Sequence, residues 1–189
     1  MYFSATLFAL LNFTNPTATS ILIALTNLLF TLLAFTLIDR LGRRPILLLT
    51  IPFMAIGLLL SAYSFSHILT SKPSSKQTSA NGPTGYALLA LTSLTVYVGA
   101  YALGIGTVPW TAQSELFKMQ HRGLGAGIAT AVNWAGNFIV GITFLGLLEG
   151  VGSWGVFGGY AGICVVGWVG VWLWFGERGG RELEDEDVY

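Results

Sequence analysis

The sequence predicts an all-α membrane protein that crosses the bilayer several times. Hydrophobic residues make up 53% of its 189 residues and charged residues only 10%, whereas soluble domains are roughly 25% charged. The charges are separated by long uncharged runs, which cover residues 1–38, 45–71, 77–114, 123–148 and 150–176. Each run exceeds the roughly 20 apolar residues that a membrane-spanning helix needs. A buried helix of a soluble domain would be shorter and would show a polar face.

Five spans are expected within one helical bundle formed by residues 1–176. The spans cover about residues 17–38, 45–67, 86–109, 123–148 and 154–176. They are helices rather than strands of a membrane barrel, because they do not alternate with period two over about 10 residues. Residues 1–11 are apolar but too short to cross, so we expect them to be the end of a further helix. Residues 177–189 form an acidic tail.

Lys and Arg residues predict the orientation of the chain. The turn 39–44 holds three of them, segment 118–122 holds two and the tail holds two, and alternation of five spans puts these on one side. Lys72 and Lys76 fall on the other side. The positive-inside rule places the larger set in the cytosol. We therefore expect a multi-pass integral membrane protein, in the plasma membrane, with a cytosolic C-terminus.

A helix break is predicted near Pro109, at the end of the third span. Proline lacks an N–H and its ring crowds the carbonyl four residues earlier, so the helix bends or stops. Gly104 and Gly106 ease that distortion, and Trp110 follows directly. Transporters place broken helices where they line a substrate cavity. The alternative is a structural kink without a ligand contact.

Polar side chains within the spans are candidates for substrate binding. Asn133 and Asn137 are four residues apart and share one helix face, and Trp134 adds a flat apolar surface beside them. Amides offer the donors and acceptors that the hydroxyl groups of a polyol require. Asn27 is a further amide in a predicted span. The alternative for Asn133 and Asn137 is hydrogen bonding between helices, and Asn27 would cost energy in lipid unless it has a partner.

Several functional classes find no support in the sequence. It has no Gly-x-Ser-x-Gly, phosphate-loop or HExxH motif, so an enzyme is not expected. His67 and His121 lack partners at metal-ligand spacing, so neither a metal nor another cofactor is expected. The net charge of zero gives no reason to expect nucleic acid. A channel would require rings of charge or carbonyl groups, which the sequence does not suggest.

Three motifs resemble the major facilitator superfamily, in the order in which that superfamily carries them. DRLGRRP (39–45) resembles its cytosolic signature turn, PWTAQSELF (109–117) and NWAGNFIVGITF (133–144) resemble the sugar porter branch, and GERGGRELED (176–185) is similar to that branch's tail. Residues 104–144 most resemble inositol transporters, above all the fungal myo-inositol transporters. The tail departs from the family at Gly176, Arg178 and Gly179. Ala102 stands where hexose carriers often have glutamate, which argues against plain glucose transport.

The resemblance implies a C-terminal six-helix half of a major facilitator bundle, with its first helix truncated. It implies alternating-access transport of a polyol or sugar, with myo-inositol favoured, and an N-terminal half-bundle as the missing partner. The lipid bilayer is the other partner, and protons are a candidate coupling ion. The substrate residues that it implies are Asn27, Asn133, Trp134 and Asn137, and Trp110 beside the helix break is a further candidate. The alternative is a membrane remnant or regulatory half-transporter that does not itself transport.

The resemblance also implies a gating network of charges at the cytosolic helix ends. Its members are Asp39, Arg43, Arg44, Glu115, Arg122 and Glu177. Glu115 is expected to pair with Arg43 or Arg44 when the carrier opens outward. The alternative is that the arginines act only as a topology signal, which would leave Glu115 unexplained because acids contribute little to orientation.

Overall fold

The computed structural model describes residues 16–70, 85–116 and 119–174 and shows helices and turns but no strand in these ranges. The helices are α2 (Pro16–Leu41), α3 (Arg43–Thr70), α4 (Gly85–Leu103), α5 (Val108–Leu116), α6 (Arg122–Gly150) and α7 (Gly152–Trp174). The all-α prediction is confirmed for these ranges. The predictions for residues 1–11 and for the tail 177–189 lie outside the described residues.

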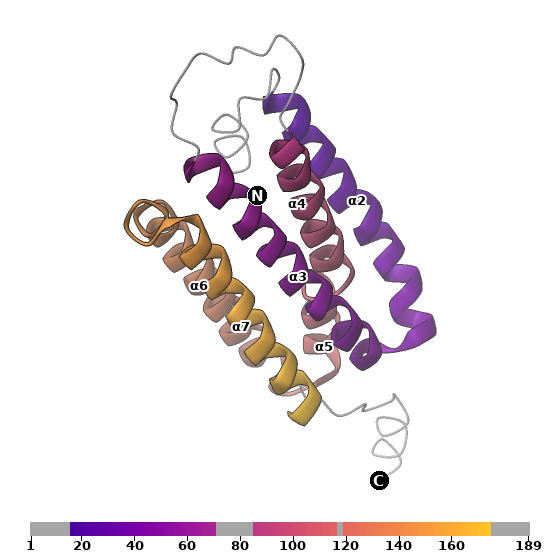
Figure 1. Ribbon diagram of the computed structural model, residues 1–189. Coiled ribbons are helices and arrows are strands. Elements are labelled where there is room, and N and C mark those ends of the chain that lie inside the picture. The colour runs from indigo at the N-terminus through magenta and orange to yellow at the C-terminus, as the bar shows by residue number, and fades with distance from the viewer. Residues whose placement is uncertain (1–15, 71–84, 117–118, 175–189) are drawn as a thin grey trace.

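The bundle is built around α3. This helix packs most extensively against α4 and α7, while α2 packs chiefly against α4 and touches α3 only slightly. In Figure 1, α2, α4 and α3 lie side by side, and α7 and α6 lie on the other side of α3. The short α5 packs against α3 and α6 below the end of α4.

Five segments in the described ranges are long and apolar enough to cross a membrane. They are Thr19–Leu41, Arg43–Ile68, Gly85–Gln113, Arg122–Gly150 and Gly152–Trp174. The third segment combines α4 and α5, so it contains an interruption. The count of six helices and the truncation of the first one remain predictions.

Two helix-to-helix turns are tighter than the sequence suggested. The turn predicted over residues 39–44 is reduced to Gly42, which has a φ of 80° between α2 and α3. At the other end of the molecule, α6 ends at Gly150 and α7 begins at Gly152, which has a φ of 79°. Glycine adopts this left-handed conformation without steric cost, so the chain reverses within one or two residues. As a result, α2, α3 and α6 extend beyond their predicted bounds, and α7 begins two residues earlier than predicted.

Close approach of α3 and α4 requires a small residue. A Cβ at Gly57 would lie 3.1 Å from both the Ser93 carbonyl oxygen and the Tyr97 Cβ. One turn further along α3, the hydroxyl oxygens of Ser61 and Ser93 are 2.8 Å apart and share a hydrogen bond, and both residues are buried. Small residues and interhelical hydroxyl contacts replace the hydrophobic driving force that helices lack inside lipid.

A proline in α3 is compensated by a tryptophan of α7. Pro52 lies inside α3 and has no N–H, so it cannot donate to the carbonyl of Leu48 four residues earlier. The indole Nε1–H of Trp168 donates to that carbonyl oxygen at 3.0 Å. The contact therefore satisfies an acceptor that the proline leaves open, and it ties α7 to α3.

The main apolar cluster joins α3, α6 and α7 through aromatic rings. Phe65 and Phe157 are stacked with ring centroids 5.3 Å apart, and Phe144 meets Phe157 edge-on at 6.2 Å. Phe144 is the one residue of α6 that is buried. The rest of α6 is therefore almost uncovered by the described part of the chain.

Candidate functional site

The uncovered helix α6 carries most of the predicted substrate residues. Asn133, Trp134 and Asn137 are all exposed, and the Trp134 side chain retains 58% of its accessible surface. The Asn137 amide Nδ2–H₂ donates to the backbone carbonyl of Asn133 at 3.0 Å. This local bond orients Asn137 along the helix and leaves its amide oxygen available for another donor.

Asn27 lies apart from these residues, on α2. It is half-buried, and its amide oxygen accepts a hydrogen bond of 3.1 Å from the Thr31 hydroxyl one turn later. Because α2 packs chiefly against α4, Asn27 and the α6 residues belong to different sides of the bundle. A ligand that contacted Asn27 and the α6 residues together would have to span from α2 to α6.

Trp110 belongs to α5, which packs against α6. It is exposed, with 48% of its surface accessible, so α5 and α6 present exposed tryptophans on adjacent helices. Trp110 follows Pro109, which occupies the first turn of α5. Proline is tolerated there because the first N–H groups of a helix have no partner within it.

The helix interruption lies at Gly104–Thr107, before Pro109. α4 ends at Leu103, and the amides of Thr107 and Val108 donate to the Gly104 carbonyl at 3.1 and 2.9 Å. The Thr107 hydroxyl donates to the carbonyl of Ala102, a group that the end of the helix leaves without its normal partner. The sequence analysis did not predict a role for Thr107. A hydroxyl residue just before Val-Pro nevertheless indicates a side chain that can bond to a carbonyl at a helix break.

Neither glycine of the interruption leaves room for a side chain. A Cβ at Gly104 would overlap the hydroxyl oxygen of Thr50 on α3, and a Cβ at Gly106 would lie 2.9 Å from the Tyr101 carbonyl oxygen. Neither glycine has a positive φ. The contact between Thr50 and Gly104 was also missed, because it joins residues far apart in the sequence.

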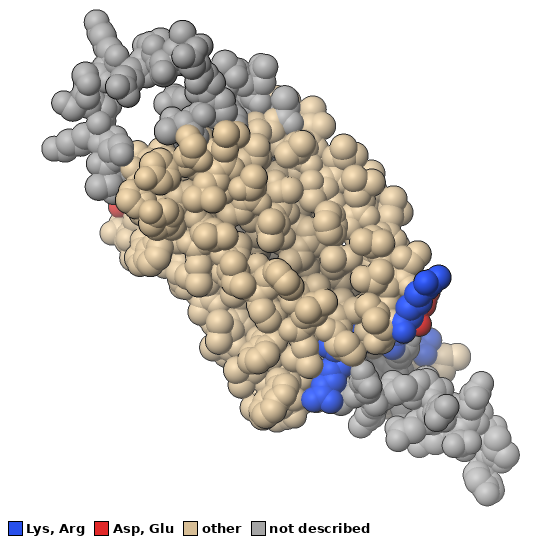
Figure 2. Space-filling model, turned by 45° about the vertical axis from the view of Figure 1, so that its right-hand side comes forward, with Lys and Arg blue, Asp and Glu red and all other residues tan. Residues whose placement is uncertain are grey.

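The predicted gating arginines lie at one end of the molecule. Arg43 and Arg44 open α3, Asp39 lies in the last turn of α2, and Arg122 opens α6. Figure 2 shows the blue atoms of Lys and Arg gathered at this end. The Arg44 guanidinium Nη2 donates to the backbone carbonyl of Trp172 at 3.0 Å, so it caps the last turn of α7.

The acidic members of the predicted network are not tested. Glu115 belongs to the last turn of α5, but its side chain is outside the described residues, and so is Glu177. α5 packs against α3 and α6, which begin with Arg43 and Arg122, but the residue of α5 that lies in an apolar cluster with α3 residues is Val108, at the start of α5. Pairing of Glu115 with these arginines therefore remains a prediction.

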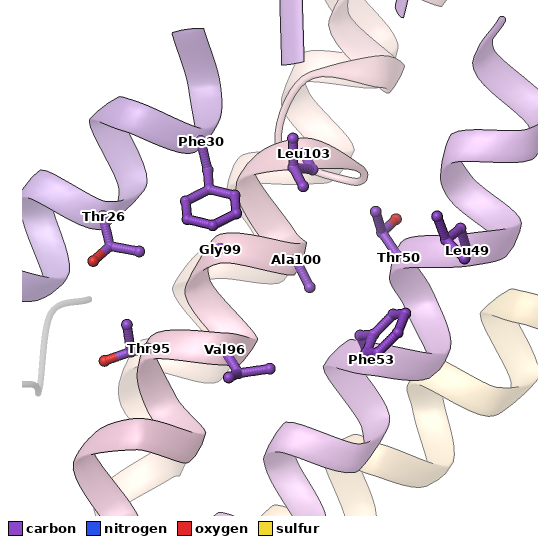
Figure 3. A pocket seen from close by; sticks show the side chains of 10 residues that line it. All are labelled: Thr26, Phe30, Leu49, Thr50, Phe53, Thr95, Val96, Gly99, Ala100 and Leu103. Atoms are coloured by element: carbon purple, nitrogen blue, oxygen red, sulfur yellow. The ribbon is translucent and has the colours of Figure 1, made fainter. Parts of the chain in front are cut away.

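A pocket of about 310 Å³ lies between α2, α3 and α4 and contains none of the predicted substrate residues. Figure 3 shows its lining, with Phe30 from α2, Thr50 and Phe53 from α3, and Gly99 and Leu103 from α4. The lining is almost entirely carbon. In the described ranges, no group of three or more His, Cys, Asp or Glu could hold a metal ion.

Comparison with known proteins places the chain in a family. The sequence profile of the family described as "Sugar (and other) transporter" matches residues 1–188. The chain belongs to this family. Sugar transporters are not enzymes, and the five long apolar helices are those of an integral membrane protein.

Several fungal members of the sugar transporter family are similar to the chain over nearly its whole length. Identity is 42% with Myo-inositol transporter 1 of Cryptococcus neoformans var. grubii, over 98% of this chain and 32% of that protein. Identity is 41% with Myo-inositol transporter 2 of Schizosaccharomyces pombe, over 97% of this chain and 32% of that protein. It is 39% with Myo-inositol transporter 1 of Saccharomyces cerevisiae, over 98% of this chain and 32% of that protein. The chain thus spans about a third of the length of these relatives.

Proposed function

We propose that this chain is the C-terminal part of a membrane transporter that carries a polyol or sugar by alternating access, with myo-inositol as the favoured substrate. The observation that supports this most directly is the exposed amide and indole surface of α6, in a chain that is about 40% identical to fungal myo-inositol transporters. That surface is exposed because almost none of the described residues covers α6. An N-terminal half-bundle facing α6 would complete the cavity.

The chemistry of the α6 surface suits a ring that carries hydroxyl groups on its edge and C–H bonds on its faces. Asn133 and Asn137 offer amide donors and acceptors to the hydroxyl groups. Trp134 offers an apolar face to the C–H bonds and one N–H donor. Trp110 on the adjacent α5 adds a second aromatic surface. Ala102, which is buried in α4, brings no carboxylate, so we favour a polyol over plain glucose.

Alternating access requires helix ends that separate and a helix that can bend. We infer that the arginines of α3 and α6, together with Glu115, hold the cytosolic helix ends together in the outward-open state. Exposed ion pairs contribute only about 0–1 kcal/mol each, so several of them bias the two states without locking either. The interruption between α4 and α5 supplies the bend, and the cytosol lies at the arginine end of the bundle. Protons are a candidate coupling ion.

The experiment replaces the matching third of the Cryptococcus relative with this chain. The chimera and the isolated chain are expressed in a yeast strain that lacks inositol uptake, and uptake of labelled myo-inositol and glucose is measured beside the amount of protein in the plasma membrane. We expect saturable inositol uptake by the chimera and none by the isolated chain, because the substrate site of such folds lies between two halves.

Two outcomes would contradict the proposal. A chimera that reaches the plasma membrane but transports neither solute would favour the alternative, a regulatory or non-transporting half. Saturable uptake by the isolated chain would show that the cavity is complete without another half-bundle. Uptake of glucose in place of inositol would support the proposed transport activity but contradict the proposed substrate.

A further inference from the structure

The pocket between α2, α3 and α4 is chemically unsuited to a polyol. Three of its lining residues are threonines, and each hydroxyl already donates to a carbonyl of its own helix. Thr26 donates to Leu22 at 2.9 Å, Thr50 to Ile46 at 2.8 Å and Thr95 to Leu91 at 2.7 Å. The three oxygens can still accept a hydrogen bond but have no donor left. A sugar placed here would therefore leave most of its hydrogen-bonding capacity unused, and each unsatisfied group costs about 1–3 kcal/mol.

The shape of the pocket suits an apolar chain. Gly99 and Ala100 of α4 are buried and form its floor, while Leu49, Phe53 and Val96 are exposed at its rim. Figure 3 shows the rings of Phe30 and Phe53 on opposite sides of it. Its volume of about 310 Å³ is at the lower end of the roughly 300–1,000 Å³ that ligand pockets occupy.

The depth of the pocket matches one leaflet of the bilayer. Thr50 and Phe53 lie six and nine residues after Arg44 on α3, which is about 9 and 14 Å along a helix that rises about 1.5 Å per residue. Half of the hydrocarbon core is about 15 Å thick. A lipid whose headgroup lies beside the α2–α3 turn therefore brings its acyl chain to the level of the pocket.

The charge of that turn selects the headgroup. The turn carries three arginines, Arg40, Arg43 and Arg44, against one acid, Asp39, and Arg40 and Asp39 are exposed. Basic sites between spans attract the headgroups of anionic lipids. Because lipid tails are as apolar as the pocket, packing alone would not distinguish one lipid from another, so the arginines must supply the selectivity.

We propose that the α2–α3–α4 pocket is an intramembrane binding site for one acyl chain of an anionic phospholipid, whose headgroup is held by the positively charged α2–α3 turn, chiefly by its exposed Arg40. The acyl chain fills a space that would otherwise cost its lining atoms their dispersion contacts. It also touches Leu103, the last residue of α4 before the interruption, and Thr50 of α3, which lies against Gly104. The site is separate from the α6 surface and does not depend on the solute transported.

The test uses the chain in nanodiscs of phosphatidylcholine that contain a minor fraction of phosphatidylserine with a photoactivatable diazirine in its acyl chain. Crosslinked peptides are mapped by mass spectrometry, and phosphatidylcholine with the same acyl chain is the comparison probe. We expect labelling to concentrate on the pocket segments 49–53 and 95–103. One arginine near the membrane surface corresponds to a preference of about fivefold for the anionic probe.

Two substitutions separate the acyl chain from the headgroup. Gly99→Leu fills the floor of the pocket, where a Cβ meets the Phe30 ring at 3.4 Å, and should abolish labelling of the pocket segments. Gly167→Leu is the matched control, because a Cβ at this exposed position of α7 meets nothing within 4 Å. Arg40→Gln should keep the labelling and reduce the preference for the anionic probe.

The unsubstituted chain decides the matter even if Gly99→Leu fails to fold. Labelling spread evenly over the exposed apolar surfaces of α6 and α7 would overturn the acyl-chain site. Equal labelling by the two probes would overturn the role of the arginines. Labelling of the pocket in this chain but not in the chimera with a relative's N-terminal part would assign the pocket to helix packing and overturn the proposal.

Discussion

The contact between Trp168 and α3 allows a double-mutant test of how this bundle is held together. Pro52 leaves the Leu48 carbonyl without its helical donor, and the Trp168 indole donates to it at 3.0 Å. Trp168→Phe keeps an aromatic ring but removes the donor. The Leu48 carbonyl then has no hydrogen-bond donor, in a half-buried, apolar environment.

We expect Trp168→Phe to lower the free energy of unfolding by about 1 kcal/mol. A buried polar group without a hydrogen-bond partner costs about 1–3 kcal/mol, whereas measured side-chain hydrogen bonds in membranes average roughly 0.6 kcal/mol. For a chain of this size, that lowers the apparent Tm by about 2–4 °C. Pro52→Ala restores an internal N–H donor to the Leu48 carbonyl. Trp168→Phe should therefore cost little in the Pro52→Ala background.

Thermal unfolding of the purified chain in one detergent, followed by intrinsic fluorescence and by loss of monodispersity, measures all four members of the cycle. Trp172→Phe is the matched control, because Trp172 is on the same helix and only its backbone carbonyl takes part in a described hydrogen bond. The reasoning is refuted if the cost of Trp168→Phe is the same with Pro52 and with alanine, within the roughly 0.3–0.5 kcal/mol by which independent sites add.

Three further predictions concern the interruption, the substrate surface and the gate. Gly104→Ala should destabilise the chain by about 1–3 kcal/mol through overlap with Thr50, and Thr50→Ala should recover most of that loss in the same unfolding assay; no recovery would disprove the contact. In the transporting chimera, Asn133→Ala should raise the inositol Kd several-fold for a lost hydrogen bond of about 0.5–1.5 kcal/mol, whereas Ile128→Ala on the opposite side of α6 should not; equal effects would remove the substrate role. Glu115→Gln should increase cytosolic cysteine labelling at the start of α6 and slow uptake, and wild-type labelling and uptake would exclude a gate.

The location of the spans could be predicted from the sequence because it depends on a one-dimensional property. Runs without charge must lie in lipid, and the five long apolar segments follow those runs closely. The predicted turn at 39–44 is too long because the ends of uncharged runs mark the edge of the apolar segment, not the end of the helix. Both flanking helices instead continue to Gly42, since charged residues are compatible with helix ends and Pro45 falls in the first turn of α3, where proline is tolerated.

The pairing of helices could not be predicted in this way. A soluble helix shows which face it buries through a polar and an apolar side, but these spans are apolar all round and carry no such stripe. The contacts of Trp168 with Leu48 and of Thr50 with Gly104 therefore left no pattern in the sequence. Pro52 was a partial signal, because a proline inside a membrane helix requires a donor from elsewhere, although it does not say which helix supplies it.

The substrate residues show a similar division. Helical spacing correctly placed Asn133 and Asn137 on one helix, and the structure adds that this helix is the least covered of the five. The spacing could not show that Asn27 packs on a different side of the bundle, because that depends on α2 choosing α4 as its neighbour.

Arg44 connects the predicted charge network to the backbone at the end of α7. Its guanidinium holds the Trp172 carbonyl at the end of α7, where a cation is also favoured by the helix dipole. A guanidinium has five N–H donors, so this bond leaves others for a carboxylate such as Glu115. The cap on α7 and the proposed pair with Glu115 are therefore compatible. If both form, opening of the transporter to the cytosol breaks the pair with Glu115 but leaves α3 and α7 joined through Arg44. The helices that separate are then α3 on one side and α5 and α6 on the other.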